Sequence, residues 1–295
     1  MPTFGTVLTA MVTPFASDGT LDLDGAQALA RHLVQHGNDG VVVAGTTGES
    51  ATLTHDEQIA LIEAVREAIP NASLVAGAGS NDTQAAVELT ERATDAGADG
   101  ILSVTPYYNR PSQAGIDAHF RAVASATDKP VVLYDIPVRT GRKIAEATLL
   151  GLLEVDNILG VKDAAKDPAG TASLISKAPP GTEVYSGDDS LTLPFLSVGA
   201  VGVIGVATHW AGQEMADMIA AYLAGDVAEA IRLNALMIPS FDFEGSDDAP
   251  NPVPSKAMMN LLGVKVGSCR PPMGYAPDDL DDRARSVLAG LGRSI

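Results

Sequence analysis

The 295-residue sequence predicts an α/β fold: a closed TIM-type (β/α)8 barrel over residues 1–225, with a C-terminal helical extension over 226–295. Eight short apolar segments alternate with segments that have helical periodicity. The apolar segments are hydrophobic at nearly every position, as are parallel strands buried on both faces. Eight such units favour a closed barrel over an open doubly wound sheet.

The expected strands lie at 6–12, 40–44, 73–77, 100–104, 130–134, 158–161, 183–185 and 201–204. The expected barrel helices lie at 23–36, after 54, and at 81–97, 115–127, 145–153, 169–177, 191–198 and 211–223. Gly37 ends the first helix, and a capping box of Thr54 and Glu57 begins the second. In the extension, helices are expected at 226–236, 255–262 and 278–291, between loops rich in Pro, Asp and Gly.

A dinucleotide-binding sheet is the main alternative fold, and the sequence disfavours it. That fold expects Gly-x-Gly-x-x-Gly after its first strand. Here Thr13-Pro14-Phe15 follows the first strand, and the later run 76–79, Ala-Gly-Ala-Gly, lacks the full spacing.

Composition restricts the class of protein. The apolar fraction of 46% suffices for a large core, and the net charge of −18 opposes binding to nucleic acid or to an anionic membrane. The single cysteine, Cys269, allows no disulfide framework and no zinc-type Cys/His spacing. We expect no metal and no cofactor. No apolar run reaches the roughly 18–20 residues of a membrane span. We therefore expect a cytoplasmic protein without a membrane partner.

The most chemically distinctive residues follow the expected strands. The active site of such a barrel lies at the C-terminal ends of its strands. The residues found there are Thr46 and Thr47 after the second strand, Tyr107 and Tyr108 after the fourth, Tyr134 and Arg139 after the fifth, Lys162 after the sixth, and Asp188 and Asp189 after the seventh. The last two are expected to cap the helix that follows.

Lys162 ends an apolar run and is the candidate nucleophile. Burial of a lysine lowers its pKa, and a neutral amine can form a Schiff base with a carbonyl. The alternative is a strand-end lysine whose ammonium reaches water. The hydroxyl groups on the same rim favour the Schiff base, because its formation moves protons. Arg139 has the planar fork that matches a substrate carboxylate.

Four stretches of the sequence resemble the dihydrodipicolinate synthase family, which belongs to the pyruvate-dependent class I aldolases together with N-acetylneuraminate lyase. They are 45–53 (Gly-Thr-Thr-Gly-Glu-Ser-Ala-Thr-Leu), 104–112 (Val-Thr-Pro-Tyr-Tyr-Asn-Arg-Pro-Ser), 134–141 (Tyr-Asp-Ile-Pro-Val-Arg-Thr-Gly) and 160–163 (Gly-Val-Lys-Asp). The similarity extends over nearly the whole chain, including 251–254 (Asn-Pro-Val-Pro).

The resemblance implies a lyase that condenses pyruvate with aspartate semialdehyde for lysine and diaminopimelate biosynthesis, in a homotetramer built as a dimer of dimers. The implied catalytic residues are Lys162 as Schiff base, Tyr134 as proton donor and acceptor, and Thr46 and Tyr108 as a hydroxyl relay in which Tyr108 or Tyr107 crosses a subunit interface. The implied substrate-binding residues are Thr47 for the pyruvate carboxylate, Arg139 for that of the second substrate, and Gly187 and Ile204 (by its carbonyl) along the pocket.

The chain departs from the family in two places. After the last expected strand the family often has Ser-Val-Thr-Ala-Asn, where this chain has 205–209, Gly-Val-Ala-Thr-His. The family's allosteric lysine site maps onto Ser50, Ala51, His55, Asn81 and Tyr107. A second histidine of that site is Gln58 here, and a glutamate that would hold the lysine ammonium aligns with Ala85. Loss of that carboxylate predicts weak or absent inhibition by lysine.

Two other functions remain open at this point. Another pyruvate-dependent aldolase, an N-acetylneuraminate lyase or a 2-keto-3-deoxy sugar acid aldolase, needs hydroxyl-binding groups where Arg139 stands. A barrel that only binds or assembles has no need of Lys162, Tyr134 and Thr46 together. The sequence therefore favours the synthase.

Overall fold

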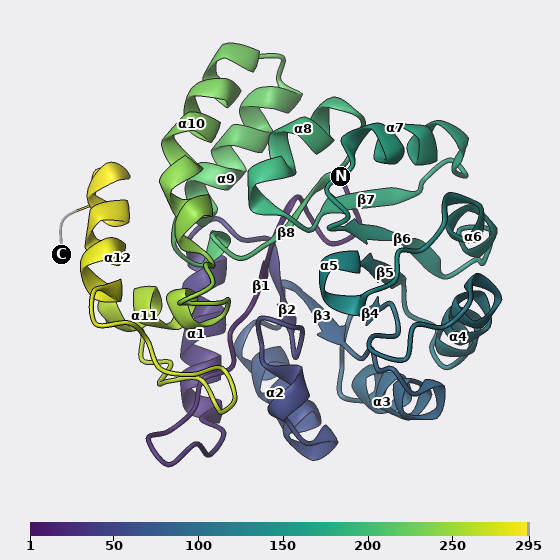
Figure 1. The fold of residues 1–295 in the computed structure, drawn as a ribbon, viewed down its shortest axis with the longest axis horizontal. Coiled ribbons are helices and arrows are strands. Elements are labelled where there is room, and N and C mark those ends of the chain that lie inside the picture. The colour runs from purple at the N-terminus through teal and green to yellow at the C-terminus, as the bar shows by residue number, and fades with distance from the viewer. Residues whose placement is uncertain (294–295) are drawn as a thin grey trace.

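Eight parallel strands close into a barrel in chain order in the computed structural model, which describes residues 1–293 (Figure 1). β8 pairs with β1 and completes the ring. The strands are β1 (Val7–Ala10), β2 (Gly40–Val43), β3 (Ser73–Gly77), β4 (Gly100–Val104), β5 (Val131–Asp135), β6 (Ile158–Asp163), β7 (Glu183–Ser186) and β8 (Gly202–Gly205). The TIM-type fold expected from the sequence is confirmed.

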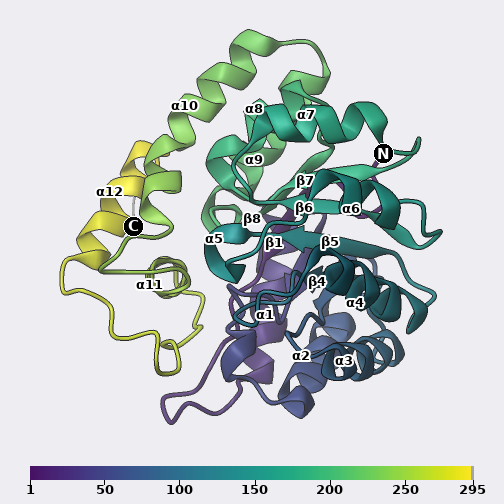
Figure 2. The ribbon, with the colours of Figure 1, turned by 45° about the vertical axis from the view of Figure 1, so that its right-hand side comes forward.

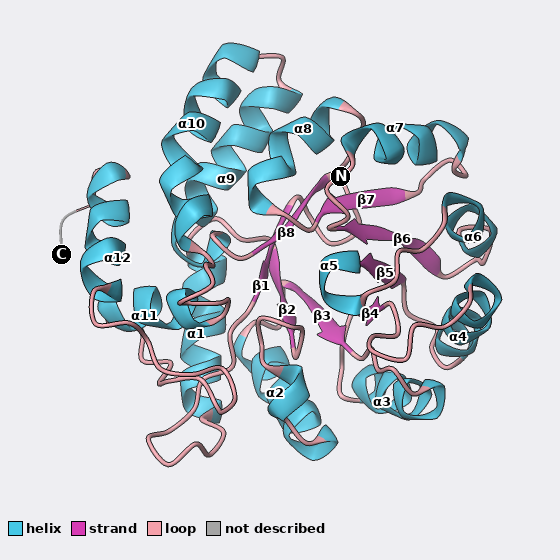
Figure 3. Ribbon diagram, viewed as in Figure 1, coloured by secondary structure: helices cyan, strands magenta, loops and turns pink. Residues whose placement is uncertain are grey.

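Helices surround the barrel on its outer side (Figure 3). They are α1 (Leu23–Gln35), α2 (His55–Ala68), α3 (Thr83–Asp95), α4 (Gln113–Ser125), α6 (Glu146–Leu152), α7 (Pro168–Lys177), α8 (Thr192–Ser197) and α9 (Thr208–Leu223). The capping box of α2 forms as expected: the Glu57 N–H donates to Thr54 Oγ1, and the Thr54 N–H donates to Glu57 Oε2. A short helix, α5 (Pro137–Thr140), was not expected and lies in the loop after β5.

Three further helices, α10 (Val227–Phe243), α11 (Val253–Leu261) and α12 (Leu280–Gly290), form the C-terminal extension. They lie on one side of the barrel, where α10 packs along α9 (Figure 2). The prediction ended the helix after Asp226 at residue 236, which is wrong, because α10 continues through Pro239. Met237, Phe241 and Phe243 are buried beyond or beside that proline, so packing outweighs its missing N–H.

The side chains of each strand alternate between the barrel interior and the helical layer. Val132 and Tyr134 of β5 point into the barrel, whereas Val131 and Leu133 pack with the core beneath the helices. β5 and β6 pair in a register that places Tyr134 opposite Lys162. The expected strand of 158–161 extends to Asp163, so Lys162 belongs to β6 itself.

Within residues 1–293, no helix combines the length and the apolar character needed to cross a membrane.

Candidate active site

A cavity of about 720 Å³ opens at the C-terminal ends of the barrel strands. The sequence-predicted residues that line it are Thr46, Thr47, Tyr134, Arg139, Lys162 and Gly187. Residues 241–242, 244–247 and 250–251, from the end of α10 and the segment before α11, also line it. The structure therefore brings six of the eight predicted catalytic and substrate-binding residues to one cavity, together with part of the C-terminal extension.

Lys162 and Tyr134 form the centre of this cavity. Lys162 is only 5% exposed, and its Nζ lies 4.3 Å from the centroid of the Tyr134 ring. Burial lowers the pKa of Lys162 to about 8, against the opposing influence of the Asp189 carboxylate. Burial also raises the pKa of Tyr134, so its phenol keeps a proton that it can donate. A poised amine thus lies beside a proton donor.

Gly187 leaves the room that the Lys162 side chain occupies. A Cβ atom at this position would lie 3.1 Å from Lys162 Cε and 2.9 Å from Ala164 Cβ. The Gly187 N–H donates to the Asp163 carbonyl at 2.7 Å, which continues the strand pairing past β7. Any larger residue at this position would displace the lysine.

The loop that carries Thr46 and Thr47 is held by the C-terminal extension. Asn251 Nδ2 donates to Thr47 Oγ1 at 2.9 Å. Glu49, buried with a left-handed φ of 57°, forms an ion pair with Lys256 Nζ at 2.6 Å and accepts from the Arg270 N–H at 2.8 Å. Sequence reasoning missed Asn251 and Lys256. A detectable signal for Lys256 was a lysine within an otherwise apolar helical segment.

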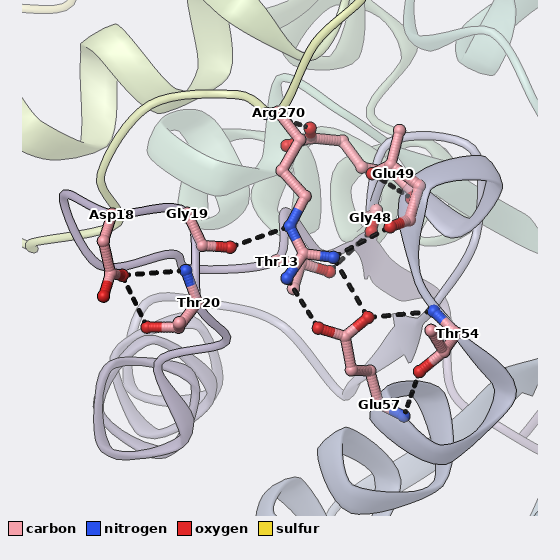
Figure 4. A network of polar contacts seen from close by, with 10 residues as sticks. Thr13, Asp18, Gly19, Thr20, Gly48, Glu49, Thr54, Glu57 and Arg270 are labelled. Carbon is pink, nitrogen blue, oxygen red and sulfur yellow. Dashed lines mark hydrogen bonds and ion pairs between the residues drawn. The ribbon is translucent and has the colours of Figure 1, made fainter.

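Figure 4 shows how Arg270 extends this anchor to α2 and to the turn after β1. Its guanidinium contacts both oxygens of Glu57, at 2.6 and 3.0 Å, and donates to the Gly19 carbonyl at 2.9 Å. The ion pair lowers the pKa of Glu57 to about 2. The loop after β2 is therefore fixed from several directions before any substrate binds.

Asp188 and Asp189 have different roles, which corrects part of the prediction. Asp188 caps the turn η2 (Asp189–Leu191) by accepting from the Ser190 N–H at 3.1 Å, and it pairs with Lys166 Nζ at 2.8 Å. Asp189 does not cap a helix. It turns inward, lines the cavity, and accepts from the Val206 N–H at 2.8 Å. The turn after β7 passes over the end of β8, which the sequence pattern did not indicate.

Tyr108 and Ile204 do not line the cavity of this chain. Tyr108 is 90% exposed with a φ of 71°, in the loop between β4 and α4. Ile204 is buried inside the barrel, in the same apolar cluster as Tyr134.

Three of the five residues of the predicted lysine site lie together, and two do not. Ser50, Ala51 and Tyr107 line a smaller cavity of about 310 Å³, which also contacts Thr46 and Arg139. His55 and Asn81 line neither cavity. His55 begins α2, and the Asn81 carbonyl accepts from Asn109 Nδ2 in the loop between β4 and α4.

Within the described part of the chain, no group of three or more His, Cys, Asp or Glu side chains is arranged to hold a metal ion. His209 is structural: its Nε2 accepts from the Val12 N–H at 3.1 Å, and burial lowers its pKa to about 4.

The model of the dihydrodipicolinate synthetase family matches residues 3–290. The chain belongs to the dihydrodipicolinate synthetase family. A 4-hydroxy-tetrahydrodipicolinate synthase of Moorella thermoacetica is 48% identical over 98% of this chain and 99% of its own length. One of Acidothermus cellulolyticus is 49% identical over 98% of this chain and 93% of its own. As a member of this family the chain is a lyase of the class I aldolase type, which confirms the expected family and class of reaction.

Solved structures of the family agree with the fold. A dihydrodipicolinate synthase of Bacillus anthracis has a TM-score of 0.94 at 41% identity, and the match covers 98% of this chain and 99% of that one. A synthase of Cyanidioschyzon merolae, described with lysine bound, has a TM-score of 0.96 at 41% identity and covers 99% of both chains.

Proposed function

We propose that this enzyme is a 4-hydroxy-tetrahydrodipicolinate synthase that condenses pyruvate with L-aspartate-4-semialdehyde through a Schiff base on Lys162. The observation that carries the proposal is a buried lysine whose pKa is lowered to about 8, placed against Tyr134 in the main cavity. The names of the curated relatives support the same reaction. The product enters lysine and diaminopimelate biosynthesis.

The Lys162 amine attacks the ketone carbon of pyruvate, and loss of water from the carbinolamine leaves an imine. Removal of a methyl proton gives an enamine, whose carbon attacks the aldehyde of the second substrate. The amine of that substrate then displaces Lys162, closes the ring and frees the lysine. Each step moves a proton, and the Tyr134 phenol is the neighbouring group that donates and accepts it.

Thr46 and Tyr108 complete the relay from Tyr134. Thr46 lines the cavity of its own chain. Tyr108 is an exposed aromatic side chain in a left-handed conformation, which a second subunit can cover. We assign it to the site of a neighbouring subunit in a homotetramer, while Tyr107 stays near the second cavity of its own chain. Full activity then requires assembly of the tetramer. We place the enzyme in the cytoplasm.

Two groups hold the substrate carboxylates. Thr47 provides a hydroxyl for the carboxylate of pyruvate, beside the Lys162 amine. Arg139 is exposed at the cavity mouth on α5 and binds the carboxylate of the semialdehyde. Gly187 lines the cavity beside Lys162. The Ile204 carbonyl is assigned to the substrate pocket on the family resemblance alone. An arginine at the mouth favours the semialdehyde over a sugar acid.

Borohydride trapping tests the proposal. Incubation with pyruvate and reduction should add one pyruvate-derived group to each chain, and peptide mass analysis should locate it on Lys162. Lys162→Met should remain folded and take up no label, and Lys129→Met, at a half-buried position outside the cavity, should be labelled as the unmodified enzyme is. An adduct at another residue would refute the mechanism. A coupled assay with the semialdehyde against N-acetylneuraminate then decides between the synthase and the other aldolases.

A further inference from the structure

Asp189 and Glu244 are two carboxyl groups in the active-site cavity that the proposed reaction does not use. Asp189 follows β7 and is 1% exposed. Glu244 stands at the C-terminal end of α10, in the extension. Their carboxyl groups face each other, and η2 packs against α10. The contact therefore joins the barrel rim to the C-terminal segment that also lines the cavity.

Two buried oxygens of this pair lack a hydrogen-bond donor. Asp189 Oδ1 and Glu244 Oε2 are buried and receive no hydrogen bond from any N–H or O–H group of the described residues. Two ionised carboxylates in contact would repel each other and leave both oxygens unsatisfied. A single proton converts the contact into an O–H···O⁻ hydrogen bond, which is short and strong.

The surroundings favour Glu244 as the group that holds the proton. Asp189 Oδ2 already accepts from the Val206 N–H at 2.8 Å, which stabilises its ionised form. Burial and the facing carboxylates of Asp189 and Asp188 raise the pKa of Glu244 well above its ordinary value.

Other charged groups face the same space. Asp188 is neutralised by its ion pair with Lys166 at 2.8 Å. Arg139 and Lys162 line the cavity, and the charges of Asp189 and Glu244 act on Lys162 in the opposite direction to that of Arg139. The pair thus supplies the negative charge that acts on the Lys162 amine.

We propose that Asp189 and Glu244 share one proton, and that this singly charged pair is a positioning device for the reaction: it fastens the end of α10 beside Lys162 and balances the positive charge of the protonated Schiff base. Neither carboxyl group needs to touch substrate. The role rests on the proposed chemistry at Lys162. It assigns to the extension a part in the active site that goes beyond support of the barrel.

Substitution of each carboxyl group by an amide distinguishes a pair that shares one proton from a pair of ionised carboxylates. Glu244→Gln keeps a donor toward Asp189 and keeps one charge, and Asp189→Asn keeps a donor toward Glu244. Each single variant should retain kcat/KM within about threefold of the unmodified enzyme. The double variant Asp189→Asn/Glu244→Gln retains an amide–amide contact but loses the charge. Its kcat should fall by at least about tenfold, and the pH midpoint of pyruvate trapping should move down by roughly one unit.

Infrared spectroscopy reports the proton without any substrate. At pH 8, where Asp135, with a pKa of about 7, is mostly ionised, the unmodified enzyme should show the carbonyl stretch of a protonated carboxylic acid. Glu244→Gln should lose that band, and Glu154→Gln, the same substitution at an exposed position, should retain it.

The outcomes divide clearly. The proposal is supported if Glu244→Gln loses the band, both single variants stay active and the double variant loses activity. A double variant as active as the singles, with an unmoved midpoint, overturns it, and so does an unmodified enzyme without the band. Failure of the unmodified enzyme to trap pyruvate on Lys162 would instead remove the proposed function, and the infrared result would still stand.

Discussion

Asn251 Nδ2 donates a hydrogen bond to Thr47 Oγ1 at 2.9 Å, across 204 positions of sequence. The contact ties the segment before α11 to the loop after β2. Because the Thr47 oxygen accepts from Asn251, its own proton is free to point toward a substrate carboxylate. The extension thus orients a binding group within the barrel.

Removal of this contact should weaken pyruvate binding. Asn251→Ala loses the donor, and we expect KM for pyruvate to rise roughly threefold to tenfold, the value of one hydrogen bond. Asn251→Asp should raise KM for pyruvate more than Asn251→Ala does, because the new carboxylate repels that of pyruvate. Steady-state kinetics with each variant check the order. Unchanged KM values in both would mean that the contact does not orient Thr47.

Lys256 should contribute to stability through its buried ion pair with Glu49. The two side chains are 2% and 1% exposed, and their atoms lie 2.6 Å apart. Lys256→Met leaves Glu49 buried without its charge partner and should lower the free energy of unfolding by about 3–5 kcal/mol. Glu49→Gln/Lys256→Met removes both charges and should recover much of that loss. Urea unfolding of the three proteins measures it, and a double variant no better than the single would contradict the explanation.

Activity should fall as pH decreases through about 8. The pKa of Lys162 lies near 8 because burial disfavours its ammonium, so the attacking neutral amine is lost below that pH. The initial rate of pyruvate trapping should drop about tenfold per pH unit on the acid side. An unfolded chain binds this proton more tightly, so Lys162 makes the free energy of unfolding rise with pH between about 8 and the ordinary lysine value of 10.5. Lys162→Met should lack that dependence.

Arg139 should act on the second substrate alone. Its side chain is exposed at the cavity mouth, whereas Lys162 is buried in the cavity interior. Arg139→Gln should raise KM for the semialdehyde by roughly tenfold to a hundredfold, as expected for a lost charge-assisted hydrogen bond. Pyruvate trapping should remain within about threefold of the unmodified enzyme, and equal damage to both steps would contradict the assignment.

Lysine should inhibit this enzyme weakly or not at all. Gln58 replaces a histidine of the predicted lysine site, and its Nε2 donates to the Ser50 carbonyl at 3.1 Å instead of facing a ligand. Ala85 supplies no carboxylate. Ala85→Glu should therefore increase the sensitivity to lysine, with Ala85→Gln as the uncharged control. Strong inhibition of the unmodified enzyme at low lysine concentration would show that the site works without that glutamate.

The sequence by itself determined the barrel and the chemistry of its rim. Eight continuous apolar strands, each followed by a helix, favour closure into a barrel, and closure brings the ends of β2, β5, β6 and β7 to one rim. Lys162, Tyr134 and Thr46 could be selected because reactive groups at strand ends are local features of a pattern. The division of the chain at residue 225 remains a prediction.

Only the tertiary structure decided what surrounds those groups. The contacts of Asn251 with Thr47, of Lys256 with Glu49 and of Glu244 with Asp189 each join residues far apart in the sequence, and no periodicity encodes them. The continuation of α10 past Pro239 and the inward turn of Asp189 depend likewise on packing against elements elsewhere in the chain. Local pattern fixes which groups can react, whereas long-range burial fixes their charge and orientation.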